Sequence, residues 1–143
     1  MRKPVVLFLP LVVVMVFSAS FAPFPRAARA QGEAGVQHGM RVLSLRLSGA
    51  GKMLDLRYDV TDAARAGEIL NKGTRAYLVH DNTGAVLGVP SMGKVGRLQQ
   101  TRNPPLPGPV YFMIFENLRS LAKKGDTLTL VIGDVYFEGL KVE

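Results

Sequence analysis

Apolar and polar residues alternate along most of the chain after residue 39, and this period of two constrains the fold more than any other feature. In 40–47, three leucines fall on one face and polar residues on the other. The pattern recurs in 53–61, after a Gly-rich stretch at 48–52 that is typical of a turn. Because successive side chains of a strand point to opposite faces, both stretches are predicted to be half-buried strands that pair as a hairpin.

The rest of the chain repeats this pattern, with turn signals at a spacing of about 8–12 residues, as in antiparallel sandwiches and barrels. A second hairpin is predicted around 81–84 and a third around 133–134, because both turns contain Asp and Gly. The stretch 110–115 is apolar on both faces, which favours a central strand covered on both sides. Further strands are predicted at 74–80, 85–89, 95–101, 110–115, 127–132 and 135–142.

The remaining segments are predicted to be one short helix and two loops. Asp62 is a good helix N-cap and Gly73 a left-handed stop, so 63–72 is predicted to be helical, with Ala66, Ile69 and Leu70 facing inward. Four prolines in 103–109 prevent ladder pairing and predict a rigid loop. In the loop after residue 115, the side chains of Leu118 and Leu121 are predicted to be buried against the core.

The first 30 residues have the three parts of a secretory signal. Arg2 and Lys3 precede an apolar stretch at 5–17, and Ala28-Arg29-Ala30 supplies the small residues of a cleavage site. Thirteen apolar residues fall short of the roughly 20 that span a bilayer. Cleavage after Ala30 is therefore predicted, and retention as an N-terminal anchor is the alternative. The mature chain is expected in the periplasm or secreted, without a membrane span, as a flexible lead-in (31–39) followed by one β domain (40–143).

Composition excludes several classes of protein. The chain of 143 residues has no cysteine, which removes disulfides, thiolate metal sites, cysteine nucleophiles and lipoprotein anchoring. Its formal net charge is +7, but four of the 18 basic residues lie in the predicted leader. The mature domain is therefore only mildly basic, and nucleic acid is not an expected partner.

A resemblance follows from the end of the chain. The sequence Lys-Lys-Gly-Asp-Thr-Leu-Thr-Leu-Val-Ile-Gly-Asp, with Tyr-Phe-Met-Ile-Phe-Glu-Asn upstream, resembles the closing strands of immunoglobulin-like sandwiches in small exported bacterial proteins. The pattern extends over about residues 40–143. It implies an all-β, antiparallel β-sandwich of about eight strands, without the Cys and Trp core of true immunoglobulin domains.

Two apparent catalytic motifs fail on spacing. The stretch 48–53 has the Gly-Lys of a phosphate loop, but Arg46 stands where the first Gly is needed and Met53 where a hydroxyl is needed. Ser91 lies near two glycines, yet the strand–turn–helix context of a hydrolase elbow is missing. The chain is therefore predicted not to be an enzyme, and a hydrolase with dispersed carboxylates is the weakest alternative.

Basic and amide side chains gather in the middle of the chain and form the candidate binding set. Arg97, Gln99 and Thr101 are expected on one strand face, flanked by further cations. Forked donors of this kind hold carboxylates or other anions, although solvated charges on an exposed face are the commoner outcome. The candidate residues are Lys94, Arg97, Gln99 and Arg102, with an acidic ligand or envelope protein as the expected partner.

Histidine and methionine residues suggest an alternative. His38 and Met40 are two apart in a stretch predicted to be extended, so an imidazole and a thioether would lie on one side, as Cu(I) prefers. His80 and Met92 are the further candidate ligands. The competing interpretation is that the methionines fill gaps in the core. The leading hypothesis is a non-enzymatic binding or accessory module of the cell envelope without a cofactor, and a periplasmic copper-handling protein is the alternative.

Overall fold

The computed structural model describes residues 36–71, 73–100 and 102–143. The predicted leader and residues 31–35 lie outside the described residues. The described part is mostly antiparallel β-sheet with one short helix. Its elements are β1 (Met40–Ser48), β2 (Met53–Val60), α1 (Ala63–Ile69), β3 (Ala76–His80), β4 (Val86–Gly88), β5 (Ser91–Met92), β6 (Gly96–Arg97), β7 (Val110–Glu116), β8 (Thr127–Ile132) and β9 (Val135–Lys141).

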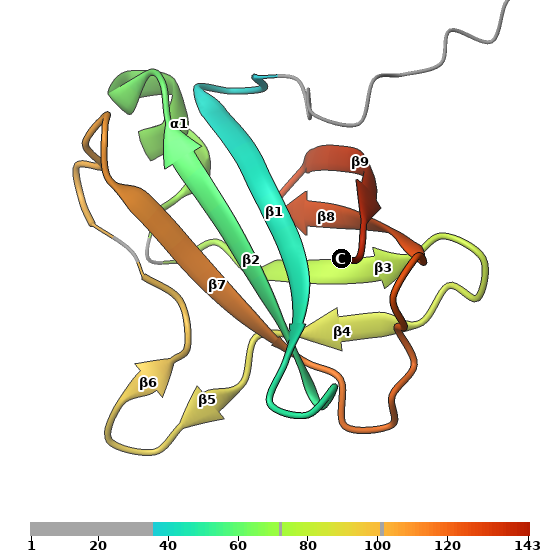
Figure 1. Cartoon of the computed structure of the whole chain (residues 1–143). Coiled ribbons are helices and arrows are strands. Elements are labelled where there is room, and N and C mark those ends of the chain that lie inside the picture. The colour runs from blue at the N-terminus through green and yellow to red at the C-terminus, as the bar shows by residue number, and fades with distance from the viewer. Residues whose placement is uncertain (1–35, 72, 101) are drawn as a thin grey trace, which may run out of the picture.

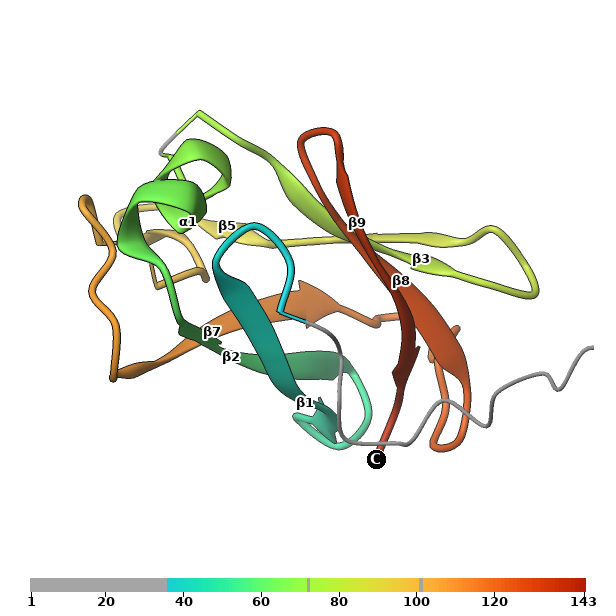
Figure 2. The same ribbon diagram turned by 90° about the horizontal axis from the view of Figure 1, so that it is seen from above.

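The strands form two main sheets and one small hairpin. The first sheet has the order β1-β2-β7, the second has the order β4-β3-β8-β9, and β5 pairs with β6 alone. Figure 1 shows the strands of the first sheet running diagonally across those of the second, and Figure 2 shows the two sheets on opposite sides of the molecule. All three predicted hairpins, β1–β2, β3–β4 and β8–β9, are confirmed as antiparallel pairs.

The two main sheets are also joined by backbone pairing at one edge. Leu45 of β1 and Val142, just after β9, form a parallel bridge. The N–H of Glu143 donates to the Leu45 carbonyl at 2.9 Å, and the Leu47 N–H donates to the Glu143 carbonyl at 3.5 Å. The last residues of the chain therefore fasten the second sheet to the first.

A single apolar core lies between the sheets. Alternate residues of β1, β2 and β7 meet alternate residues of β3, β8 and β9, as the period of two requires. Burying each such large side chain contributes roughly 1.5–3 kcal/mol. Side chains that are almost fully buried include Leu54, Leu56, Tyr58, Leu78, Met113, Phe115, Leu128 and Leu130.

The predicted helix forms, but its end differs from the prediction. The Asp62 carboxylate accepts the N–H groups of Ala64 and Arg65, which confirms its role as N-cap. The helix ends at Ile69 with Leu70 as its C-cap, three residues before the predicted end, so Gly73 is not the residue that stops it. Instead, the Asn71 side chain accepts the N–H groups of Gly73 and Thr74. No helix in the described residues is long and apolar enough to cross a membrane.

Two further predictions need correction. Strand β7 is not central, because the order β1-β2-β7 places it at the edge of its sheet, where the backbone of 98–100 covers it. Leu118 and Leu121 are exposed rather than buried, since Ala122 takes the inward position. At the N-terminal side, 36–39 are described, and 37–39 form a hydrogen-bonded turn into β1.

Candidate functional site

The β5–β6 hairpin carries two of the predicted binding residues. It projects from the two main sheets at the lower left of Figure 1. The strand predicted over 95–101 is reduced to the short β6, because Gly93 and Gly96 have positive φ and turn the chain within a few residues. Lys94 and Arg97 lie on this hairpin and are exposed. Met92 and Val95 are also exposed there, at 51% and 76%.

Gln99 does not share a face with Arg97, which corrects the predicted arrangement. The chain bends at Leu98, and the Gln99 N–H donates to the Arg97 carbonyl at 2.8 Å. Gln99 then pairs with Met113 of β7, whose side chain is buried. Directly opposed residues of an antiparallel pair point to the same face, so Gln99 points inward. Its Oε1 is buried without a hydrogen-bond partner.

Two tyrosines hold the segment that follows the hairpin. Tyr58 donates its hydroxyl to the Gln100 carbonyl at 3.1 Å and stacks on Tyr111 with ring centroids 5.4 Å apart. Tyr111 in turn accepts the N–H of Leu106 and donates to its carbonyl. Burial, and secondarily the neighbouring Tyr111, raises the pKa of Tyr58 far above its usual range, so its hydroxyl remains a donor. The exposed Arg102 lies on this anchored segment, beyond the hairpin.

The four residues of the copper alternative lie in different environments. His38 has a positive φ within a turn, so the extended geometry predicted for His38 and Met40 is absent. Met40 is fully buried in the core, whereas His38 and Met92 are exposed. His80 is the last residue of β3 in the second sheet, whereas Met92 belongs to the separate β5–β6 hairpin. The geometry therefore does not assemble these side chains into one ligand set.

His80 takes part in a buried polar arrangement of its own. Its Nδ1 accepts the Asn82 N–H at 3.3 Å, and its Nε2 lies 3.1 Å from the Asp126 carboxylate. The same carboxylate oxygen accepts the Lys123 N–H at 2.8 Å. With Nδ1 accepting, the proton of the neutral ring lies on Nε2, from which it is donated to Asp126. The group links the turn after β3 to the residue before β8, which is a structural role.

Asp126→Asn is expected to destabilise the protein at neutral pH, with a difference from the wild type that shrinks in acid. The Lys123 N–H, and secondarily the His80 ring, hold the pKa of Asp126 below its usual value. A depressed folded-state pKa gives stability that is present above the unfolded-state pKa of about 3.9 and lost as the pH falls through the folded-state value. Urea unfolding at neutral pH and near pH ~2 measures this, with Asp134→Asn as control. A difference that is constant with pH contradicts the assignment.

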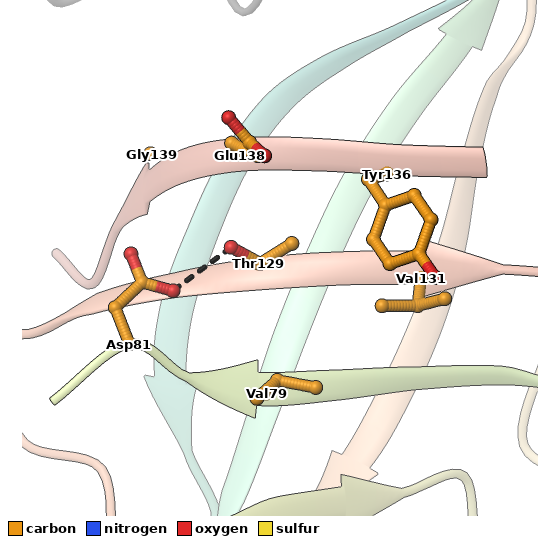
Figure 3. A pocket seen from close by; sticks show the side chains of 7 residues that line it. All are labelled: Val79, Asp81, Thr129, Val131, Tyr136, Glu138 and Gly139. Atoms are coloured by element: carbon orange, nitrogen blue, oxygen red, sulfur yellow. Dashed lines mark hydrogen bonds between the residues drawn. The ribbon is translucent and has the colours of Figure 1, made fainter. Parts of the chain in front are cut away.

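A shallow depression lies on the outer face of the second sheet. It has a volume of about 560 Å³. Figure 3 shows the Asp81 carboxylate, which accepts the Thr129 hydroxyl at 2.8 Å, and the Tyr136 ring beside Val131. The Asp81 carboxylate is thus already bonded to a neighbour, and the lining of the depression mixes apolar and polar side chains. Its lining residues are Val79, Asp81, Thr129, Val131, Tyr136, Glu138 and Gly139.

Comparisons of the chain with protein-family models, with curated proteins and with solved structures found no match. A binding surface needs exposed apolar and charged side chains close together. Among the described residues, the β5–β6 hairpin has both, and it also includes the predicted binding residues Lys94 and Arg97.

Proposed function

We propose that the chain is a non-enzymatic, exported binding or accessory module of the cell envelope. In this proposal the leader is removed after Ala30, and an immunoglobulin-like sandwich acts in the periplasm or outside the cell. The partner is an envelope protein with an acidic surface or another acidic ligand. The proposed sandwich is supported by two antiparallel sheets that pack around one core. Unlike an open sandwich, the two sheets are joined at one edge, where β1 pairs with residues after β9.

The observation that carries the proposal is the composition and position of the β5–β6 hairpin. Val95 and Met92 expose apolar surface next to the cations Lys94 and Arg97. Contact with a partner would remove the apolar side chains from water, while the cations select an acidic surface and speed the encounter. The base of the hairpin is closed by a backbone hydrogen bond, in which the Leu98 N–H donates to the Pro90 carbonyl at 3.1 Å.

Replacing Val95 by Ser together with Arg97 by Gln is expected to reduce capture of the partner from envelope extract at least tenfold. Loss of one buried valine and one charged contact costs roughly 2 kcal/mol of binding free energy, which corresponds to more than a factor of ten. The matched control is Val86→Ser with Arg65→Gln, which removes an exposed valine and an exposed arginine elsewhere. Quantitative mass spectrometry of captured proteins provides the measurement. Equal capture by the hairpin variant, or equal loss in the control, contradicts the proposal.

A further inference from the structure

The loop after β7 is fixed by a buried asparagine. Asn117 is almost fully buried, and its Nδ2 donates to the carbonyls of Gly51 and Ala122 at 2.9 and 2.8 Å. Its Oδ1 accepts the Ala122 N–H at 3.0 Å. The side chain is therefore fully satisfied, and it ties the loop both to itself and to the β1–β2 turn, which lies beside it in Figure 1. This stretch, residues 117–124, is called the leucine loop below.

The same bonds hold two leucines outward. Ala122 occupies the inward position, and Leu118 and Leu121 remain 64% and 44% exposed. Ser120 has a positive φ of 51°, which turns the chain between them. The two leucines are thus held partly in solvent by a rigid loop, although removing apolar surface from water is favourable.

Cations surround these leucines. The Lys52 ammonium donates to the Leu118 carbonyl at 3.3 Å and to the Ser120 hydroxyl at 3.1 Å, which places a positive charge against the loop. Arg119, Lys123 and Lys124 are exposed, and none of the ion pairs in the described part of the chain uses them. Four cations therefore accompany two exposed leucines.

The two acidic groups next to the loop, Glu116 and Asp126, offset only part of the charge of these four cations. Glu116 is an exposed residue at the end of β7. The Asp126 carboxylate is already bonded to the Lys123 N–H and to the His80 ring. The surface therefore has a positive excess with apolar side chains inside it.

We propose that the leucine loop, with Lys52, docks the protein on an anionic lipid surface. Exposed apolar side chains beside several Lys and Arg residues are what peripheral membrane contact requires: the leucines enter the headgroup region and the cations meet the anionic lipids. A protein partner fits less well, because Leu is under-represented among the residues that dominate protein interfaces. The proposal does not depend on the β5–β6 hairpin.

Single-tryptophan variants test the proposal, because the chain has no Trp of its own. Leu118→Trp places the reporter in the loop, and Val86→Trp places it at a position of nearly equal exposure, 63%, on the second sheet. With phosphatidylglycerol vesicles, the emission of Leu118→Trp is expected to shift to shorter wavelength, and that of Val86→Trp to stay unchanged. If the leader remained attached and inserted into the vesicles, it would not by itself shift the emission of a tryptophan at position 118. Leu121→Trp is the second reporter if Leu118→Trp does not fold.

The contribution of the cations is tested with the same tryptophan reporter. Combining Leu118→Trp with Arg119→Gln, Lys123→Gln and Lys124→Gln is expected to raise the half-saturating lipid concentration at least tenfold. The control replaces the exposed cations Arg65 and Arg75 by Gln and is expected to have a smaller effect. Absence of the spectral shift, an equal shift in Val86→Trp, or an equal shift with neutral phosphatidylcholine vesicles overturns the proposal.

Discussion

Replacing Gly39 with alanine is expected to lower the free energy of unfolding by about 3 kcal/mol, the sum of a positive-φ cost of roughly 1–2 and an overpacking cost of roughly 1–3. Gly39 has φ +71°, and a Cβ there would lie 2.4 Å from the backbone oxygen of Asp62. The Gly39 carbonyl also accepts the N–H groups of Thr61 and Asp62. The chain cannot move away without losing the contact between the turn before β1 and the start of α1.

The matched control is Gly51→Ala. Gly51 has a similar φ of +78°, but nothing lies within 4 Å of the position of an added Cβ. This variant has only the conformational cost, about 1 kcal/mol. Urea denaturation of both variants measures the difference. Equal losses would show that the close approach of Gly39 to Asp62 contributes nothing.

Asn117→Ala is expected to destabilise the fold by a similar amount, about 3 kcal/mol, because buried groups left without partners cost roughly 1–3 kcal/mol each. The substitution leaves three backbone groups without their hydrogen-bond partner: the N–H and carbonyl of Ala122 and the carbonyl of Gly51. Asn71→Ala is the control, since Asn71 also makes several hydrogen bonds but is exposed. Water replaces its bonds, and a loss of about 1 kcal/mol or less is expected.

Chemical denaturation of both asparagine variants tests this difference. The Asn117 variant is expected to have a lower midpoint of unfolding than the Asn71 variant, with a similar dependence on denaturant. If the two midpoints agree, the Asn117 bonds are not what fixes the leucine loop. The membrane proposal would then lose the rigidity on which its geometry depends.

The hairpins were predictable because each is a local feature. Alternation fixes which residues face the core, and Gly at a turn fixes where the chain reverses, as at Gly84 with φ +69°. The N-cap Asp62 is local in the same sense. These signals need no knowledge of the distant chain.

Features set by distant segments were not predictable in this way. The apolar stretch of β7 suggests a central strand, yet the sheet order places β7 at an edge. Its outer side pairs with residues 98–100, the second half of the strand predicted over 95–101, and the sequence does not show which strand these residues join. Whether Leu118 or Ala122 faces inward depends on where Asn117 reaches the β1–β2 turn. A single-residue offset in an irregular loop reverses which side chain is buried.

The candidate site shows the same limit. Lys94 and Arg97 could be found from charge alone, but the inward orientation of Gln99 follows from its pairing with Met113. The candidate copper ligands are separated by the turn at His38, by the burial of Met40 and by the placement of His80 and Met92 in different sheets. Their spacing in the sequence does not show any of these features. The outer-face depression likewise combines β3, β8 and β9, and only the register of these strands brings Asp81 to Thr129.

The central claim is that the β5–β6 hairpin recognises a partner in the cell envelope. The most direct measurement is crosslinking in the native cell, with a photoreactive amino acid at Val95 in one strain and at Val86 in another. Both side chains are largely exposed, so solvent access alone does not distinguish them. The account predicts a discrete adduct with an envelope protein or ligand from position 95 and none from position 86. Absence of an adduct at 95, or the same adducts from both positions, would contradict it.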